Sequence, residues 1–282
     1  MNSIDSTNSI DLKKALMLGL CFACLGLLYF TTFRSMVYDW IHLPDFSHAF
    51  FVPFISLFFA WQRRDRLVQL PASPSNAGIA VFVFGLFLFL LGNAASESFT
   101  MRASFLFVVS GIIIFLLGWR HLRALLFPIA YLIFMIPMPS ILLQKITFPM
   151  QLFASNVAEF SLKTLGVPVL REGNVIHLAD TTLEVAEACS GIRSLLSLLA
   201  LGTALAYFTK KLFWERAVLI LFCFPIAIFV NALRVSATGL LANTYGLAAA
   251  EGFFHGFSGY VLFVAAFLLF MLLGFLLSKL SR

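Results

Sequence analysis

Long apolar runs, repeated along the whole chain, set the strongest limit on how it can fold. About twenty apolar residues cross the hydrocarbon core of a bilayer as a helix, and inside that core every backbone polar group must be bonded within the protein. Runs that approach this length occupy residues 15–33, 47–61, 77–95, 103–119, 122–138, 191–208, 214–236 and 257–278. We therefore expect an all-α polytopic membrane protein with about eight transmembrane helices.

The overall composition agrees with a membrane protein and excludes a soluble one. Hydrophobic residues make up 61% of the chain and charged residues only 11%, which leaves too little polar surface to cover a water-soluble core. The net charge of +6 does not indicate a nucleic-acid partner, because the basic residues are spread through the gaps between the apolar runs. The expected surroundings are the lipid bilayer, with no nucleic acid as a partner.

Lysine and arginine residues in these gaps predict how the chain is oriented. In an eight-span arrangement one side carries Lys13, Lys14, Arg63, Arg64, Arg66, Arg120, Arg123, Lys210, Lys211, Arg216, Lys279 and Arg282. Since the side rich in basic residues is cytoplasmic, we expect both termini in the cytoplasm, with residues 1–14 as a polar segment and residues 15–282 as a single transmembrane domain. The first run lacks the cleavage pattern of a signal peptide. The second run is short for a span, so it is either tilted or partly re-entrant.

Residues 139–188 form the longest polar interruption, on the extracytoplasmic side of this arrangement. Its first part, 141–165, mixes apolar with polar residues, as in an amphipathic helix that lies at a membrane interface. Its second part, 169–187, is rich in β-branched residues and has turn signals around Gly173 and Asp180. We expect an amphipathic helix and a β-hairpin element of two or three strands between the fifth and sixth spans.

Cys189 follows this insertion directly, at the start of the sixth span. The predicted topology exposes it to the outer compartment, whereas Cys21, Cys24 and Cys223 lie inside apolar runs as inert packing. The thiolate is the nucleophilic form of cysteine, and the positive end of a helix dipole favours that form. The backbone N–H groups of Ser190 and the glycine after it are available at the same helix end to bind an oxyanion.

Two later spans bring an arginine and a histidine to the same outer side. Arg234 lies near the outer end of the seventh span, and an ionisable residue within a span marks a functional site unless it reaches the interface. Asn231 lies three residues before Arg234 and so shares its helical face. His255 immediately precedes the eighth span. Cys189, Arg234 and His255 therefore reach one outer face from three consecutive helices.

This set is sufficient for acyl transfer by a cysteine nucleophile. His255 could deprotonate the thiol, and Arg234 could stabilise the tetrahedral oxyanion. Arg193, four residues after Cys189 on the same helix, competes with Arg234 for that role, and the sequence alone does not decide between them. Possible supporting residues are Arg193, Ser190, Asn231 and Glu187. The histidines show no metal-binding spacing, so we expect neither a metal nor another cofactor.

The motifs around these residues resemble those of the exosortases, within the exosortase/archaeosortase group of membrane enzymes. The segment Glu-Ala-Cys-Ser-Gly-Ile-Arg-Ser at 187–194 is similar to that family's cysteine motif, 231–234 to its arginine motif and 255–259 to its histidine motif. Residues 47–56 resemble its second-helix pattern, with Ala49 in place of an expected glycine, and 171–176 resemble the hairpin before its cysteine. The likeness extends from near residue 45 to the C-terminus.

The resemblance implies a membrane-embedded cysteine endopeptidase or transpeptidase of the bacterial inner membrane. Its expected partners are exported proteins with a C-terminal sorting tail of the PEP-CTERM kind, which has a short Pro-Glu-Pro-type motif, a transmembrane helix and a basic end. The enzyme would cleave near the motif through a thioester acyl-enzyme, which water or an unidentified acceptor nucleophile then resolves. The family often accompanies exopolysaccharide production.

Two functions of other classes stay open at this point. A transporter or channel would use Arg193 and Arg234 to bind an anion, but transporters commonly have repeated halves with broken helices, which are not evident in this chain. A non-catalytic or transport component of an exopolysaccharide export system would need no nucleophile at all. Replacing Cys189 separates these functions from an enzyme.

Overall fold

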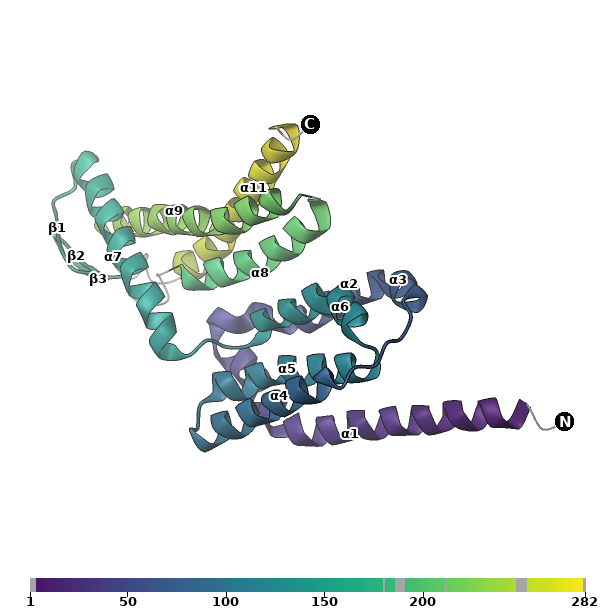
Figure 1. The fold of residues 1–282 in the computed structure, drawn as a ribbon. Coiled ribbons are helices and arrows are strands. Elements are labelled where there is room, and N and C mark those ends of the chain that lie inside the picture. Colours follow the sequence, from purple (N-terminus) through teal and green to yellow (C-terminus); the bar gives the residue numbers. More distant parts are fainter. Residues whose placement is uncertain (1–3, 180, 186–190, 211, 247–252, 281–282) are drawn as a thin grey trace. The chain divides into compact units, whose positions relative to one another are not determined.

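The computed structural model describes residues 4–179, 181–185, 191–210, 212–246 and 253–280, and it is mainly helical (Figure 1). In chain order the elements are α1 (Ile4–His42), η1 (Pro44–Phe51), α2 (Val52–Gln62), α3 (Arg64–Gln69), α4 (Ala77–Ala94), α5 (Ser98–Leu116), α6 (Trp119–Tyr131), η2 (Leu132–Met135), α7 (Ser140–Thr164), β1 (Val169–Glu172), β2 (Val175–Leu178), β3 (Thr182–Glu184), α8 (Ile192–Thr209), α9 (Phe213–Tyr245) and α11 (Phe253–Leu280). The two η elements are short 3-10 helices.

Within the part of the chain that the structure describes, five helices are long and apolar enough to cross a bilayer: α4, α5, α8, α9 and residues 259–279 of α11. The number rises to six if α6 and η2 form one broken span with α7. The sequence-based expectation of a multi-pass, mostly helical membrane protein is therefore confirmed. The short second run, 47–61, consists of η1 followed by most of α2.

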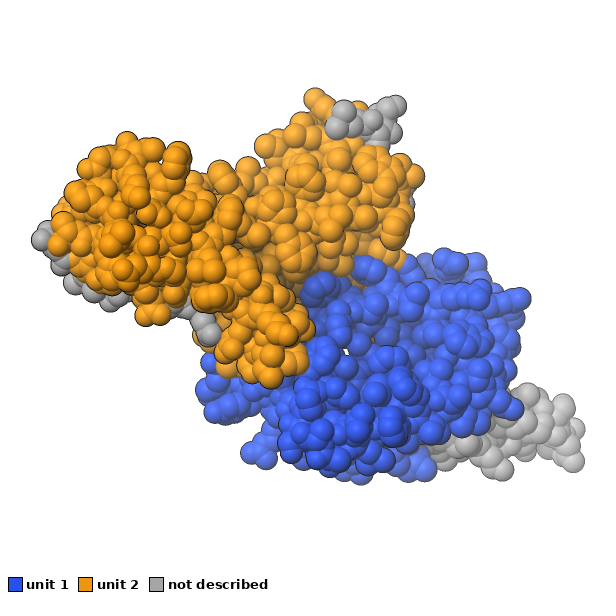
Figure 2. Space-filling model, turned by 60° about the vertical axis from the view of Figure 1, so that its left-hand side comes forward, with its two compact units in different colours: residues 1–42, 60–137 blue, residues 43–59, 138–282 orange. Residues whose placement is uncertain are grey.

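The chain forms two compact units, coloured separately in Figure 2. The first contains residues 1–42 and 60–137, and the second contains residues 43–59 and 138–282. The second unit thus takes its first segment from the N-terminal part of the chain, and it contains every described residue of the cysteine, arginine and histidine motifs.

In the first unit, α4 and α5 pack together along a row of glycines. Gly78, Gly85 and Gly92 all lie buried on one side of α4. A Cβ atom added at Gly85 would lie 2.8 Å from the backbone nitrogen of Val108, and one added at Gly92 would lie 2.6 Å from that of Met101. Such distances leave no room for a side chain, so the absence of side chains is what lets the two backbones approach.

We expect Gly85→Leu to separate α4 from α5, because its side chain would collide with the α5 backbone rather than with a flexible side chain. Overpacking of a tight contact typically costs about 1–3 kcal/mol, and a backbone obstacle belongs at the upper end of that range. The measurement is the melting temperature of the detergent-solubilised protein. The control is Gly26→Leu in α1, where an added Cβ has no heavy atom within 4 Å. Equal melting temperatures for the two variants would contradict the close-packing argument.

Charged and polar side chains fix α1 to α5 in the same unit. The Arg102 guanidinium lies 2.5 Å from the Asp39 carboxylate and donates a 3.1 Å hydrogen bond to the Ser35 hydroxyl. The Arg102 side chain is only 6% exposed, so its charge is compensated by a partner inside the fold rather than by water. Tyr29 and Ser104 add a hydrogen bond of 2.7 Å between the same two helices.

In the second unit, α8, α9 and α11 share one apolar core. Cys223 of α9 lies in this core and is fully buried. At the opposite end of α8 from the cysteine motif, the buried Lys210 ammonium donates hydrogen bonds to the Gly274 carbonyl and the Ser278 hydroxyl of α11. These contacts hold the three helices together over most of the length of α8.

The segment from η1 to α2 runs alongside α8 in the same direction. Asp45 in η1 forms an ion pair with Arg193 in the first turn of α8, at 3.6 Å. Phe59 in α2 packs against Tyr207 in the last turn of α8, with ring centroids 5.4 Å apart. The second-helix motif, which starts two residues after Asp45 and includes the fully buried Ala49, therefore begins at the same end of α8 as the cysteine motif.

The insertion between η2 and α8 contains the expected helix and strand element. The helix is α7, and β1, β2 and β3 form an antiparallel three-stranded sheet in that order. The turn between β1 and β2 consists of Gly173 and Asn174, and Gly173 has a φ of +64°, which glycine adopts without strain. Ile176 and Leu183 of the sheet pack against α7 and the C-terminal half of α9. Glu159 of α7 joins the sheet through an ion pair with Arg171 of β1 at 3.0 Å, and it forms a second ion pair, at 2.7 Å, with Lys163 of α7 itself.

Candidate active site

The start of α8 is held against α9 by a contact between Gly191 and Asn231. Gly191 is the N-cap of α8 and has a left-handed backbone conformation, with φ +78°. A Cβ atom at this position would lie 2.7 Å from Cγ of Asn231, whose side chain is almost fully buried. Gly191 is thus required both by its backbone conformation and by the close approach of Asn231. The arginine motif and the end of the cysteine motif are therefore neighbours in the fold.

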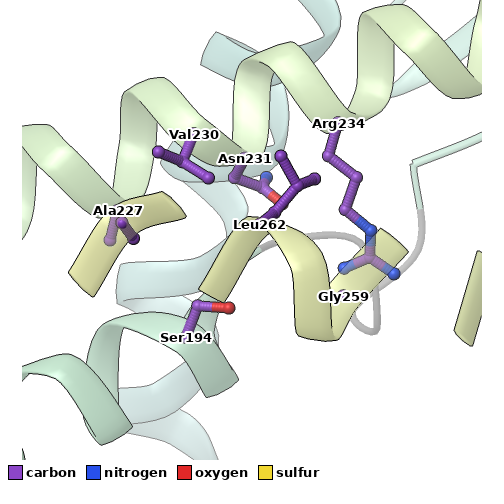
Figure 3. A pocket seen from close by; sticks show the side chains of 8 residues that line it. Ser194, Ala227, Val230, Asn231, Arg234, Gly259 and Leu262 are labelled. Carbon is purple, nitrogen blue, oxygen red and sulfur yellow. The ribbon is translucent and has the colours of Figure 1, made fainter. Parts of the chain in front are cut away.

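A small pocket lies between α8, α9 and α11 at this end of the bundle (Figure 3). Its volume of about 10 Å³ is close to the space that one water molecule needs. The residues that line it are Ser194, Ala227, Val230, Asn231, Arg234, Gly259, Leu262 and Ala266. Figure 3 shows the side chains of Asn231 and Arg234 extending from α9 toward the part of α11 that contains Gly259. All three helices that carry the motifs thus line the pocket, with polar side chains from α8 and α9 and only glycine and apolar residues from α11.

The two candidate arginines have different surroundings. Arg234 is half-buried, its Nε atom is shielded from solvent, and its side chain lines the pocket. Arg193 is 53% exposed, does not line the pocket, and forms its ion pair with Asp45 of η1. Arg193 therefore helps to attach η1 to α8, while Arg234 supplies the positive charge of the pocket.

His255 belongs to the first turn of α11, but its side chain lies outside the described part of the structure. Gly259 follows it by four residues in the same helix and lines the pocket. Cys189, Ser190 and Glu187 also lie outside the described residues. The structure thus brings together Asn231, Arg234 and the residues that follow Cys189, and it leaves the position of the thiol itself undescribed.

No described group of three or more His, Cys, Asp or Glu side chains is arranged to hold a metal ion. The described cysteines outside the motif are Cys24, which is exposed on α1, and Cys223, which is buried. Cys21 lies in α1 with an undescribed side chain. Among the described residues, the polar side chains that line the pocket near the start of α8 carry hydroxyl, amide and guanidinium groups.

Ser194 and Gly259 are among the pocket residues that sequence reasoning missed. Both belong to the motif segments, at the last position of each. Ser194 lies three residues after Gly191, and that spacing places both on the side of α8 that faces α9. A helical projection from Gly191 would have found Ser194. The role of Gly259 could not be found that way, because it depends on the approach of Arg234 from another helix.

Comparison with known protein families gives one match that covers most of the chain. The model of the transmembrane exosortase family matches residues 40–272. No match was found among curated proteins or among solved structures. The matched range begins just before η1 and ends within α11, so it includes the three motifs, the insertion and the helices α4 and α5. This match, together with the apolar helices, shows that the chain belongs to the transmembrane exosortase family.

Proposed function

We propose that the protein is a membrane-embedded cysteine protease or transpeptidase that cleaves the C-terminal sorting tail of exported proteins. The observation that carries the proposal is the packing of the arginine motif against the N-cap of α8, two residues after Cys189. Asn231 contacts Gly191, and Arg234 extends into the pocket beside them. Consecutive Cα atoms are about 3.8 Å apart, so Cys189 can be no farther than about 7.6 Å from Gly191, measured between Cα atoms.

The reaction proposed for these groups has two steps. In the first, the Cys189 thiolate attacks the carbonyl carbon of the scissile peptide bond, a sulfur–carbon bond forms, and negative charge develops on the carbonyl oxygen. Arg234 stabilises that oxyanion. The carbon–nitrogen bond then breaks, and the amine leaves with a proton from His255. In the second step water or an acceptor nucleophile attacks the thioester, gives up its proton to His255 and releases the thiolate.

The role of His255 is supported by its place in α11. It lies four residues before Gly259, which lines the pocket, and residues four apart share one helical face. The three proposed catalytic residues, Cys189, Arg234 and His255, thus belong to the segment just before α8, to α9 and to α11, respectively. The reaction needs no cofactor, because nucleophile, base and oxyanion donor are all side chains of this chain.

The topology proposed with this function is the eight-span arrangement, with both termini in the cytoplasm and the active site extracytoplasmic. The distribution of Lys and Arg supports it. The five or six membrane-capable helices among the described residues agree with a multi-pass arrangement but do not fix the number at eight. In a bacterium with two membranes, the enzyme would lie in the inner one, and residues 139–188 would cover its outer mouth. The substrate tail, itself a transmembrane helix, would then enter sideways from the lipid.

We expect a membrane-impermeant thiol reagent, added to intact spheroplasts, to label Cys189. Cys223 should stay unlabelled because it is fully buried, and Cys21 and Cys24 because the proposed topology places this part of α1 inside the bilayer. The measurement is the mass of tryptic or cyanogen bromide fragments, with Cys189→Ala as the control for the labelled site. If the reagent labels Cys189 only when it can reach the cytoplasmic face of the membrane, the proposed orientation is wrong.

The proposed chemistry is tested by co-expression with a reporter that ends in a sorting tail. The tail combines a Pro-Glu-Pro-type motif, a transmembrane helix and a basic end. An active enzyme should shorten the reporter by the mass of the tail, and Cys189→Ala enzyme should not. A non-catalytic or transport component of exopolysaccharide export would tolerate the loss of this thiol, so full processing or unchanged export with Cys189→Ala would favour that alternative.

A further inference from the structure

The sheet of the insertion ends in a strand, β3, with one open edge. The strand order is β1-β2-β3, so β3 pairs only with β2 among the described strands. The Val185 N–H donates to the Asn174 carbonyl, and the Thr181 carbonyl accepts from the Leu178 N–H. Because the backbone groups of alternate residues point to opposite sides of an antiparallel strand, those of Thr182 and Glu184 point away from β2.

This edge is exposed but firmly supported. Thr182 and Glu184 are exposed, and within the described parts of the chain no hydrogen bond reaches their outward N–H and carbonyl groups. Leu183 and Val185, which alternate with them, are buried against α7 and α9. The backbone of β3 is therefore held in place by its apolar side chains while its outer N–H and carbonyl groups face solvent.

The open edge also lies close to the proposed nucleophile along the chain. Cys189 follows Glu184 by five residues, and even a fully extended chain of that length spans only about 17 Å. The other edge of the sheet, on β1, lies two strand spacings away, or about 10 Å farther. Of the two edges, β3 is thus the one that leads into the cysteine motif.

We propose that the outer edge of β3 binds an extended segment of the substrate polypeptide as a fourth strand, parallel to β3. This inference rests on the proposed function and names where the substrate chain lies before cleavage. β3 leads into α8, which enters the membrane, and the substrate segment leads into its own transmembrane helix from the same side. The two chains therefore run in the same direction, and the register on Thr182 and Glu184 selects the peptide bond that reaches Cys189.

The short length of β3 suits a tethered substrate better than a second copy of the enzyme. Three residues offer only a few main-chain hydrogen bonds, and each contributes about 1 kcal/mol net. That is sufficient for a segment already concentrated at the site by its membrane-bound helix. It is too little for a stable dimer, since specific interfaces bury roughly 1,200–2,000 Å².

Proline at the edge provides a selective test. In Glu184→Pro the lost N–H is one that faces outward, so the β2–β3 hydrogen bonds are kept while an added strand is obstructed. We expect KM for the tail-bearing reporter to rise by about tenfold or more, as the loss of about one main-chain hydrogen bond with added obstruction predicts. The alkylation rate of Cys189 by a small thiol reagent should stay unchanged. Glu184→Gln, which keeps the N–H, is the matched control and should keep the wild-type KM.

A photo-crosslinking amino acid at position 182 gives a second, independent measurement in the Cys189→Ala background, where the reporter stays uncut. We expect an adduct with the reporter segment just before its transmembrane helix, and a much weaker one from position 170 on β1. Stronger capture at position 170, adducts between two enzyme chains, or an unchanged KM in a well-folded Glu184→Pro protein would each overturn the edge proposal. If Cys189→Ala enzyme instead cuts the reporter, the catalytic proposal fails. The crosslinking from positions 182 and 170 is then compared with a reporter that cannot be cleaved, so that the edge proposal is still tested.

Discussion

Enzyme with Cys189→Ala should leave a tail-bearing reporter at its full mass, with processing reduced by at least about 10⁴-fold. The reason is that the thiol is proposed to form the covalent intermediate, and none of the described polar residues of the pocket, Ser194, Asn231 and Arg234, is a comparable nucleophile. Removing the nucleophile of a hydrolase commonly costs even more than this. The measurement is the intact mass of the reporter over time, at membrane levels of enzyme matched to wild type.

Two related variants sharpen this expectation. Cys189→Ser should be nearly as inactive, because a hydroxyl is a far weaker acid than a thiol and needs a stronger base. His255→Ala should lose about 10² to 10⁴ in rate, as expected for a positioned proton-transfer group. Cys223→Ala is the control, since that thiol lies in the apolar core and should affect stability alone. Processing by Cys189→Ala at the rate of Cys223→Ala would refute the cysteine mechanism.

Arg234→Lys should lower turnover by about 10² to 10³, the usual cost of removing a donor to an oxyanion. Lysine keeps the charge, but it lacks the planar fork of donors that a guanidinium offers, so it should rescue the function poorly. The pocket position supports this expectation, because Arg234 lines it from α9 while Asn231 holds the start of α8 in place. The measurement is kcat for the reporter at saturating concentration.

The matched control is Arg193→Lys, which keeps a cation near Asp45. That ion pair is partly exposed, and pairs that water reaches contribute only about 0–1 kcal/mol. We therefore expect near-normal turnover from this variant. An inactive Arg193→Lys together with a nearly normal Arg234→Lys would mean that the oxyanion role belongs to Arg193, while the cysteine mechanism would stand.

Much of the helical architecture could be predicted from the apolar runs, and the errors have local causes. The run at 214–236 ends where polar residues begin, yet α9 continues to Tyr245. Within this extension the Ser236 and Thr238 hydroxyls donate to carbonyls four residues earlier in the helix, so polar side chains do not end it. Gly246, with φ +82°, follows its last residue. Hydropathy reports burial in lipid, whereas hydrogen bonding decides where a helix stops.

Other helix boundaries differ from those expected from the apolar runs because of helix caps and prolines. The helix expected at 103–119 begins at Ser98, because the Glu97 carboxylate accepts hydrogen bonds from the Phe99 and Thr100 N–H groups and caps it. The run at 122–138 divides into α6 and the 3-10 turn η2, in a region with prolines at 128, 137 and 139. These effects involve a few atoms each, so a measure averaged over twenty residues does not detect them.

The types of residue in the candidate site could be predicted from the sequence, but most of the contacts between them could not. Arg234 and Asn231, which both line the pocket, could be predicted as candidates because an arginine and an asparagine one turn apart are costly inside a span. The contact between Asn231 and Gly191 could not, since it depends on the distance between two helix axes. The ion pair between Arg193 and Asp45 depends in the same way on how η1 lies along α8. Long-range packing of this kind leaves no trace in residue spacing.

The interleaved path of the chain has a consequence for the order of synthesis. Asp45 and Phe59 find their partners on α8, roughly 150 residues later in the chain, and a ribosome adds about 5–20 residues per second. The segment 43–59 therefore waits about 8 to 30 s before α8 exists, with Phe46 and Val52, both buried in the finished fold, still unpacked. During that interval the apolar side chains of segment 43–59 must be shielded from water by lipid or by the insertion machinery. The unit that contains the pocket can close only after the cysteine motif and α8 have left the ribosome.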